Sequence, residues 1–212
     1  MSARSLTDRD LEILEALTLK VRLLALRQLA SHWWNGELAN ARRRMRALAG
    51  VDLVERITVS ARTLPPVEAP IATWQSGQPA PAFGSVAQRL QSRWLRRAVR
   101  PVAAYIATAR AAQLLGGRAR GELKHPLQAA HDLGLAAVWL CLRRRAPRWA
   151  AAFRSEDLLA HTRRAQKCPD AFIVDEAGVP VWAIEFGGSY DTARVRAFHE
   201  DCARRELPYQ IW

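Results

Sequence analysis

The order of apolar segments in the last third of the chain constrains the fold more than any other feature. Short runs rich in β-branched and aromatic residues are strand candidates, at 149–153, 171–174, 179–186 and 209–212. Segments with helical spacing of apolar residues accompany them, at 126–145, at 155–161 (SEDLLAH, begun by Ser155) and at 191–204. Turn residues at 176–178 join two of the strands as a hairpin. A hairpin followed by a helical crossover to another strand predicts an α/β domain with the core order αβββαβ.

The first fifty residues have a different pattern, which is typical of short helices. Thr7, with Asp10 three residues later, predicts a capped helix start. The turn dipeptide Asn35-Gly36 separates two further helices, and Gly50 ends the second. The predicted elements are a helix from Thr7, an extended piece at 21–24, and helices at 26–34 and 37–49.

Two strand candidates follow these helices. The β-branched run 53–60 is predicted to pair with 71–75 across the proline-rich segment 62–70. Helix, helix, turn, helix, strand, wing and strand is the order of a winged helix-turn-helix. The whole chain is therefore predicted to be α+β, with a winged helix-turn-helix followed by an α/β domain.

The segment between these regions has a composition typical of a connection. Residues 76–83 (SGQPAPAF) predict a linker, and helical patterns follow at 85–99 and 101–115. The expected domains are 1–75 for the winged helix, 76–124 for the linker and bridging helices, and 125–212 for the α/β domain. The residues leave open whether the two middle helices bridge the domains, extend the first one or form a homodimer contact.

Positive charge is the outstanding property of the composition. The chain has 32 lysines and arginines against 20 acids, a net charge of +12, and because three of the cations are lysines, 29 are arginines. Such an excess favours a polyanionic partner, and guanidinium suits phosphate and guanine. We predict contacts to double-stranded DNA from Asn40, as an adenine reader, Arg42, Arg43, Arg44 and Arg46 on the third helix, and Arg56 and Arg62 on the wing. The alternative is a solvated charged face on a small helical domain.

Several classes of protein are excluded by the sequence pattern. Three cysteines without CxxC spacing predict neither a disulfide framework nor a zinc knuckle. The apolar stretches are broken by arginine or proline before they could cross a bilayer, and the first residues lack the apolar core of a signal peptide. We expect a cytoplasmic protein without a membrane partner.

Two acids lie where the predicted hairpin would bring them together. Asp170 opens one strand and Glu185 ends the next, 15 positions later. Two carboxylates side by side can hold Mg²⁺ for phosphodiester hydrolysis. This arrangement, with Pro169 before the first acid, resembles the PD-(D/E)xK motif of restriction-endonuclease-like folds.

The chain departs from that motif at two positions. Gly187 stands where the family has a lysine, and His131 with Asp132 occupies the helix that commonly supplies a further glutamate. Three interpretations stay open for Asp170 and Glu185: a working metal site in which His131 is a further candidate catalytic residue, an inherited but silent site, or ordinary polar residues at strand ends.

The combination resembles the replication-relaxation family of bacterial plasmids and mobile elements. The likeness rests on LTDRDLEILEAL, LRQLASHWWNGELANARRRMRAL and VDLVERI near the start, and on HDLGLAAVWLCL and CPDAFIVDEAGVPVWAIEF further on. The resemblance implies a winged helix before a nuclease-like domain, and a role in plasmid replication, mobilisation or DNA relaxation.

We therefore expect a DNA-binding protein of a plasmid, mobile element or defence system, whose nuclease-like domain is inactive and needs no cofactor. One alternative is a Mg²⁺-dependent endonuclease or nickase that uses Asp170 and Glu185. Another is a structural module that binds protein partners in a replication, mobilisation or defence complex.

Overall fold

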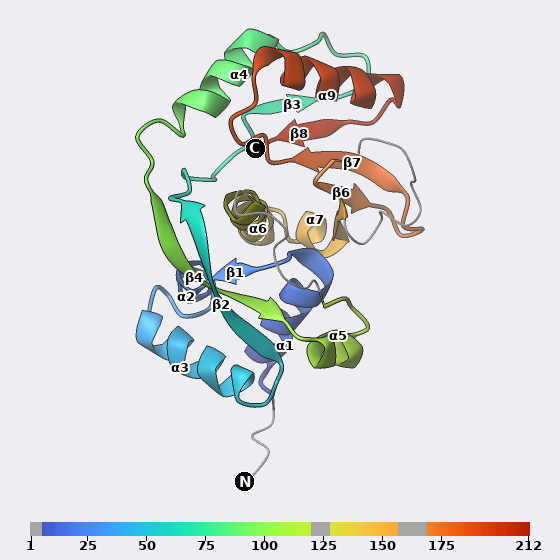
Figure 1. Ribbon diagram of the computed structural model, residues 1–212. Coiled ribbons are helices and arrows are strands. Elements are labelled where there is room, and N and C mark those ends of the chain that lie inside the picture. The colour runs from blue at the N-terminus through green and yellow to red at the C-terminus, as the bar shows by residue number, and fades with distance from the viewer. Residues whose placement is uncertain (1–5, 120–127, 157–168) are drawn as a thin grey trace. The chain divides into compact units, whose positions relative to one another are not determined.

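The computed structural model describes residues 6–119, 128–156 and 169–212, and these form a mixed α+β protein (Figure 1). The chain divides into two compact units. One contains Met1–Ala61 and Arg100–Ala136, and the other contains Arg62–Val99 and Ala137–Trp212. Each unit is thus built from two separate stretches, which differs from the contiguous ranges 1–75, 76–124 and 125–212 expected from the sequence.

Helices dominate the first unit and surround a small sheet. Its elements are α1 (Asp8–Glu15), a π-helical segment (Ala16–Lys20), β1 (Leu24–Ala25), α2 (Leu26–Trp33), α3 (Leu38–Ala49), β2 (Val54–Arg62), β4 (Val99–Ala107), α5 (Ala109–Leu115) and the first half of α6 (Gln128–Arg145). The described strands form a sheet of order β1-β4-β2. The ends of β2 and β4, at Arg62 and Val99, already belong to the second unit.

The start of α1 and the turn before α3 follow the sequence predictions. The Thr7 hydroxyl accepts the Asp10 backbone N–H, and the Asp10 carboxylate accepts the Thr7 N–H, which completes a capping box. Asn35 and Gly36 both have positive φ, at 50° and 90°, as the predicted turn requires. Ile13 and Leu14 of α1 and Leu26 and Leu29 of α2 are buried and contribute to the core of this unit.

The partner of β2 differs from the prediction. β4 lies beside β2, whereas the sequence pattern predicted a helix over 101–115 and a pairing of 53–60 with 71–75. The second half of that predicted helix is observed, as α5. Alanines and the proline at position 101 favoured the helix, but the segment buries Tyr105 and Ile106 as a strand. Pro101 is tolerated because β1 pairs only with Ala104 and Tyr105, so no β1 partner is needed there.

The second unit is a five-stranded sheet, in the described residues, with helices packed on it. Its further elements are β3 (Ala72–Trp74), α4 (Phe83–Ser92), the second half of α6, α7 (Pro147–Ala152), β5 (Phe153–Ser155), β6 (Ala171–Val174), β7 (Pro180–Glu185), α9 (Thr192–Arg204) and β8 (Tyr209–Ile211). The strand order is β3-β8-β7-β6-β5. β7 and β8 are parallel, and the other pairs are antiparallel.

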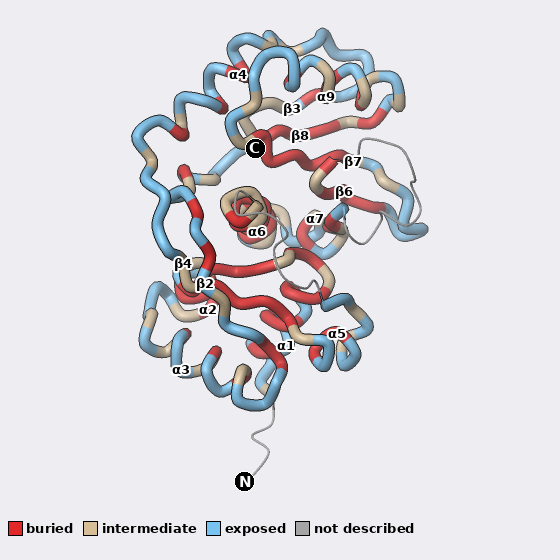
Figure 2. The backbone as a smooth tube through the Cα atoms, viewed as in Figure 1, coloured by how far each residue is buried: buried red, intermediate tan, exposed pale blue. Residues whose placement is uncertain are grey.

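Helices α4 and α9 lie together over one face of this sheet (Figure 1). Their apolar side chains meet those of β3, β6, β7 and β8 in one core, which includes Leu90, Phe172, Val195 and Tyr209. Figure 2 shows β6 and most of β8 as buried backbone. The C-terminal half of α6 is joined to α7 by a hydrogen bond from the Trp139 indole N–H to the Ala150 carbonyl, at 3.2 Å.

Several expected boundaries change in this unit. The segment 71–75 is a strand, but it pairs with β8. The helix expected at 85–99 ends at Ser92, and most of the strand expected at 149–153 is the helix α7, which begins at Pro147. Ser155 ends β5, and Glu156 directly after it is helical, as the predicted helix capped by Ser155 requires; residues 157–161 of that helix lie outside the described residues, as do 126–127 before α6.

None of the helices in the described ranges is both long enough and apolar enough to cross a bilayer.

Candidate functional site

The exposed side of α3 is rich in arginine. Ala41, Met45 and Leu48 are buried, so the helix is anchored by one apolar stripe. Arg42 and Arg46, one turn apart, are exposed on one flank. The other flank carries Asn40, Arg43, Arg44 and Ala47, each of which has another member of the set three or four positions away. α3 contains no acidic residue, so the helix presents positive charge along its exposed length.

Arg44 does not lie free on this surface, contrary to the prediction of a mostly outward arginine. Its Nε donates to Asp10 Oδ1 at 2.7 Å, and a terminal nitrogen donates to Asp10 Oδ2. The Asp10 side chain is 0% exposed. Its burial would raise the pKa of this carboxyl, but the hydrogen bonds from Arg44 and Thr7 outweigh burial and hold the pKa below its ordinary value. Arg44 is therefore an internal link between α1 and α3.

Asn40 is also engaged within the protein. Its amide oxygen accepts a hydrogen bond from Arg43 at 3.0 Å. Reading of adenine by asparagine uses the amide oxygen and nitrogen together. In this structure that oxygen contacts Arg43, and the adenine contact stays a prediction.

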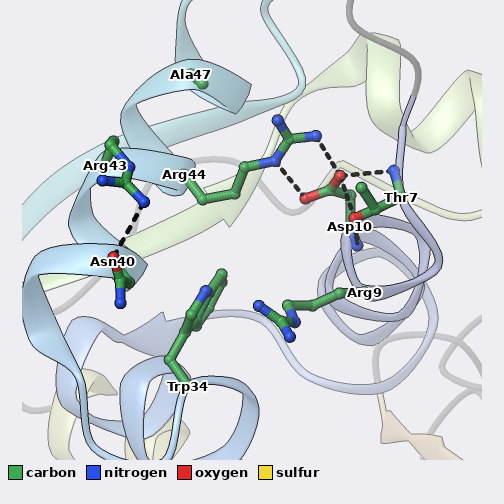
Figure 3. Close-up of a pocket in the computed structure, with 8 residues that line it drawn as sticks. All are labelled: Thr7, Arg9, Asp10, Trp34, Asn40, Arg43, Arg44 and Ala47. Atoms are coloured by element: carbon green, nitrogen blue, oxygen red, sulfur yellow. Dashed lines mark hydrogen bonds and ion pairs between the residues drawn. The ribbon is translucent and has the colours of Figure 1, made fainter.

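A pocket of about 330 Å³ lies between the start of α1 and the second flank of α3 (Figure 3). Arg9 and Trp34, which are not among the predicted site residues, line it together with the residues just described. The Arg9 guanidinium carbon lies 5.1 Å from the centre of the Trp34 ring. The position of Trp34 directly before the Asn35-Gly36 turn was the available signal for it, because that turn leads into α3. No local pattern connects Arg9 with α3.

Arg56 and Arg62 are both exposed on β2. They are six positions apart, so they project from the same face of the strand. Neither is among the residues that line the α1–α3 pocket.

The structure places Asp170 and Glu185 side by side, as the hairpin spacing predicted. Ala171 pairs with Ile184, which sets the two acids at adjacent strand ends. The Asp170 N–H donates to Glu185 Oε2 at 3.1 Å, and the Phe186 N–H donates to Asp170 Oδ2 at 2.7 Å. Each carboxylate thereby holds a backbone group of the opposite strand end.

Tyr190 and Arg194 close over these acids. The Tyr190 hydroxyl donates to Glu185 Oε1, and Arg194 donates to the Tyr190 oxygen at 3.1 Å. The Arg194 guanidinium also lies 4.0 Å from the centre of the Tyr190 ring. Burial, and then the charges of Glu185 and Asp170, raise the pKa of Tyr190 well above its ordinary value, so the phenol stays protonated as a donor. These residues line a pocket of about 200 Å³, together with Glu156, Pro169, Phe198 and Asp201.

A Mg²⁺ ion in this pocket would compete with hydrogen bonds that the protein already makes. Both oxygens of Glu185 accept hydrogen bonds from protein donors. Within the described ranges, no group of three or more His, Cys, Asp or Glu residues is arranged to hold a metal ion. Mg²⁺ prefers an octahedral set of oxygen ligands, whose approach the Tyr190 hydroxyl obstructs at Glu185.

The position of the missing lysine is closed by packing. A Cβ added at Gly187 would lie 2.9 Å from both terminal methyl groups of Leu90 and 3.0 Å from Cγ2 of Ile211. Leu90 is fully buried in α4, so a longer side chain at position 187 would displace the core. His131 lies on the part of α6 that belongs to the first unit, with Nδ1 3.7 Å from Asp132, and it does not line the carboxylate pocket.

Comparison of the chain with protein-family models, with curated proteins and with solved structures finds no match.

Proposed function

We propose that this protein binds double-stranded DNA through the exposed arginines of α3. The observation that carries the proposal is that Arg42, Arg43 and Arg46 are exposed on a helix without acids, while Ala41, Met45 and Leu48 anchor it. Guanidinium groups on an exposed helix can contact guanine edges and backbone phosphates in the major groove.

The element order of the first unit supports a winged helix-turn-helix. Helices α1, α2 and α3 are followed by β2 and β4, and β4 lies between β1 and β2 in the sheet. On this proposal the wing is the whole segment between β2 and β4, which contains β3 and α4 of the second unit. Arg56 and Arg62, exposed on the strand that enters the wing, are proposed as additional phosphate contacts.

The second unit is proposed to be a restriction-endonuclease-like scaffold without nuclease activity. The order α6, α7, β5, β6, β7, α9, β8 of the described elements, with β8 parallel to β7, supports that scaffold. The closed position at Gly187 and the hydrogen bonds to both oxygens of Glu185 support its inactivity. We propose that the protein serves a plasmid, mobile element or defence system in the cytoplasm, as the sequence resemblance implies.

The test is binding to a fluorescent duplex by anisotropy over a range of salt concentrations. Each phosphate contact contributes a slope of about 0.9 in a plot of log affinity against log salt, so affinity should fall steeply. Substitution of Arg42 and Arg46 by alanine should reduce affinity by roughly tenfold or more, at about 1 kcal/mol or more for each lost contact. The charge-matched control replaces the exposed Arg110 and Arg148 and should bind like the wild type. A flat salt dependence, or equal losses in both double variants, would refute the proposal.

A metal-dependent endonuclease is the second candidate, because Asp170 and Glu185 lie side by side at the strand ends. Nicking of supercoiled plasmid with Mg²⁺ or Mn²⁺ distinguishes the two functions. We expect no nicking by the wild type. Metal-dependent nicking that is lost in both Asp170→Ala and Glu185→Ala would establish the endonuclease instead.

A further inference from the structure

The pocket between α1 and α3 contains arginines from both of its walls. Arg9 comes from α1, and Arg43 and Arg44 come from α3 (Figure 3). In this view Arg43 and Asn40 lie on one side of the Trp34 ring and Arg9 lies on the other. Three guanidinium groups thus border one pocket of about 330 Å³.

The single acid that lines this pocket, Asp10, is already neutralised. Its carboxylate accepts hydrogen bonds from Arg44 and from the backbone and hydroxyl of Thr7, and its side chain is 0% exposed. Asp10 and Arg44 therefore cancel as a pair. The positive charge that remains at the pocket comes from Arg9 and Arg43.

Arg9 and Arg43 are held in place without being neutralised. Among the described residues neither forms an ion pair. Arg9 is placed by the face of Trp34, at 5.1 Å from the ring centre, and Arg43 by the amide oxygen of Asn40, at 3.0 Å. A guanidinium has five N–H donors, so the single bond to Asn40 leaves most of the donors of Arg43 for a ligand.

These contacts favour an anion over a nucleobase as the ligand. The stacked position of Arg9 occupies one face of Trp34, and the amide oxygen of Asn40 is taken by Arg43. What the pocket offers is a set of N–H donors with net positive charge, which suits the oxygens of a phosphate. Arg42 and Arg46 lie on the other flank of α3, where base edges could be reached.

We infer that this pocket holds one backbone phosphate of the bound DNA duplex, gripped by Arg9 from α1 and Arg43 from α3. The inference rests on the proposed DNA-binding function. It assigns a different kind of DNA contact to each flank of α3. The flank that contains Arg43 positions α3 on the DNA backbone, and the flank that contains Arg42 contacts the bases. Asp10 fixes Arg44 and thereby links α1 to α3 beside the pocket.

The experiment compares Arg9→Gln and Arg43→Gln with the control Arg110→Gln. Affinity is measured by anisotropy for two duplexes of unrelated sequence over a range of salt concentrations. Each pocket variant should lose about tenfold in affinity, to the same extent on both duplexes. Each should also lower the salt slope by about one, whereas the control should do neither. Thermal unfolding of both variants should match the wild type, since neither arginine is in the core.

The possible outcomes separate this inference from the function on which it rests. If the wild-type protein does not bind duplex DNA, both fail. If it binds and the Arg42 and Arg46 variant loses affinity while the pocket variants behave like the Arg110 control, the DNA-binding function stands and the phosphate pocket is refuted. A loss in the pocket variants that depends on the duplex sequence would show a base contact and also refutes the phosphate.

Discussion

Replacement of Asp10 by asparagine tests the internal link between α1 and α3. The Asp10 carboxylate is 0% exposed and accepts hydrogen bonds from the Thr7 N–H at 2.7 Å, the Thr7 hydroxyl at 2.6 Å and Arg44 Nε at 2.7 Å. An asparagine keeps one oxygen for Thr7, but its amide N–H groups would face the donors of Arg44. The variant loses the ion pair and the negative charge in the first turn of the helix.

The loss of stability on this substitution depends on how far the two partners are exposed. Removing one member of a fully buried pair costs about 3–5 kcal/mol. The Arg44 side chain is 23% exposed, so water compensates part of that loss, and we expect the variant to be less stable by about 2–4 kcal/mol. Urea unfolding followed by circular dichroism measures this difference, with the exposed Asp8→Asn in the same helix turn as the control.

The same pair predicts a pH dependence with a defined sign. The pKa of Asp10 is lowered in the folded protein, so its stabilising contribution is complete above its ordinary pKa of 3.8 and is lost as the pH falls through the lower folded value. The Asp10→Asn variant should lack this part of the acid sensitivity. A further Arg44→Met change should recover some stability, because it removes the unpaired guanidinium. A loss below about 0.5 kcal/mol, equal to that of Asp8→Asn, would refute the assigned role of the pair.

Two other changes address the second unit. Gly187→Ala should cost about 1–3 kcal/mol in urea unfolding, because its Cβ would lie 2.9 Å from the buried methyl groups of Leu90. Gly84→Ala, where nothing lies within 4 Å of the added atom, should be neutral or stabilising, and equal losses at the two glycines would contradict the packing argument. Burial lowers the pKa of His199 from its ordinary 6.5, with only a smaller opposing effect of a neighbouring acid, so stability should fall as the pH drops below about that value. His199→Gln should flatten this dependence below pH 6.5, and an unchanged profile would show that another group titrates there.

The hairpin and its flanking elements could be predicted because local pattern and tertiary structure agree there. The strand at 171–174 was predicted with its observed bounds, since a β-branched run ends in a turn with Gly178 at φ 80°. The adjacency of Asp170 and Glu185 followed from the same hairpin. For such segments, the alternation of side chains and the turn chemistry are sufficient.

Elsewhere, tertiary pairing overrode local preference. The alanine-rich segment of β4 has a local preference for a helix. It is a strand because it pairs with β1 on one side and β2 on the other. The hydrogen bond from Arg44 to Asp10 spans 34 positions, and no periodic pattern in the sequence predicts it. The packing that fills the space at position 187 depends on Leu90 in α4. The sequence pattern assigned this helix to the linker region, so its place in the second unit was not predicted.

The interior position of β8 in the sheet has a consequence for the order in which the protein can assemble during synthesis. β8 lies between β3 and β7, so β3 leaves the ribosome long before the strand with which it pairs. Until residues 209–211 emerge, the edge of β7 and the whole of β3 expose unpaired backbone groups, which are prone to pair with other chains. The nascent chain should therefore depend on chaperones until β8 emerges, and release of a chain truncated before β8 should give aggregates.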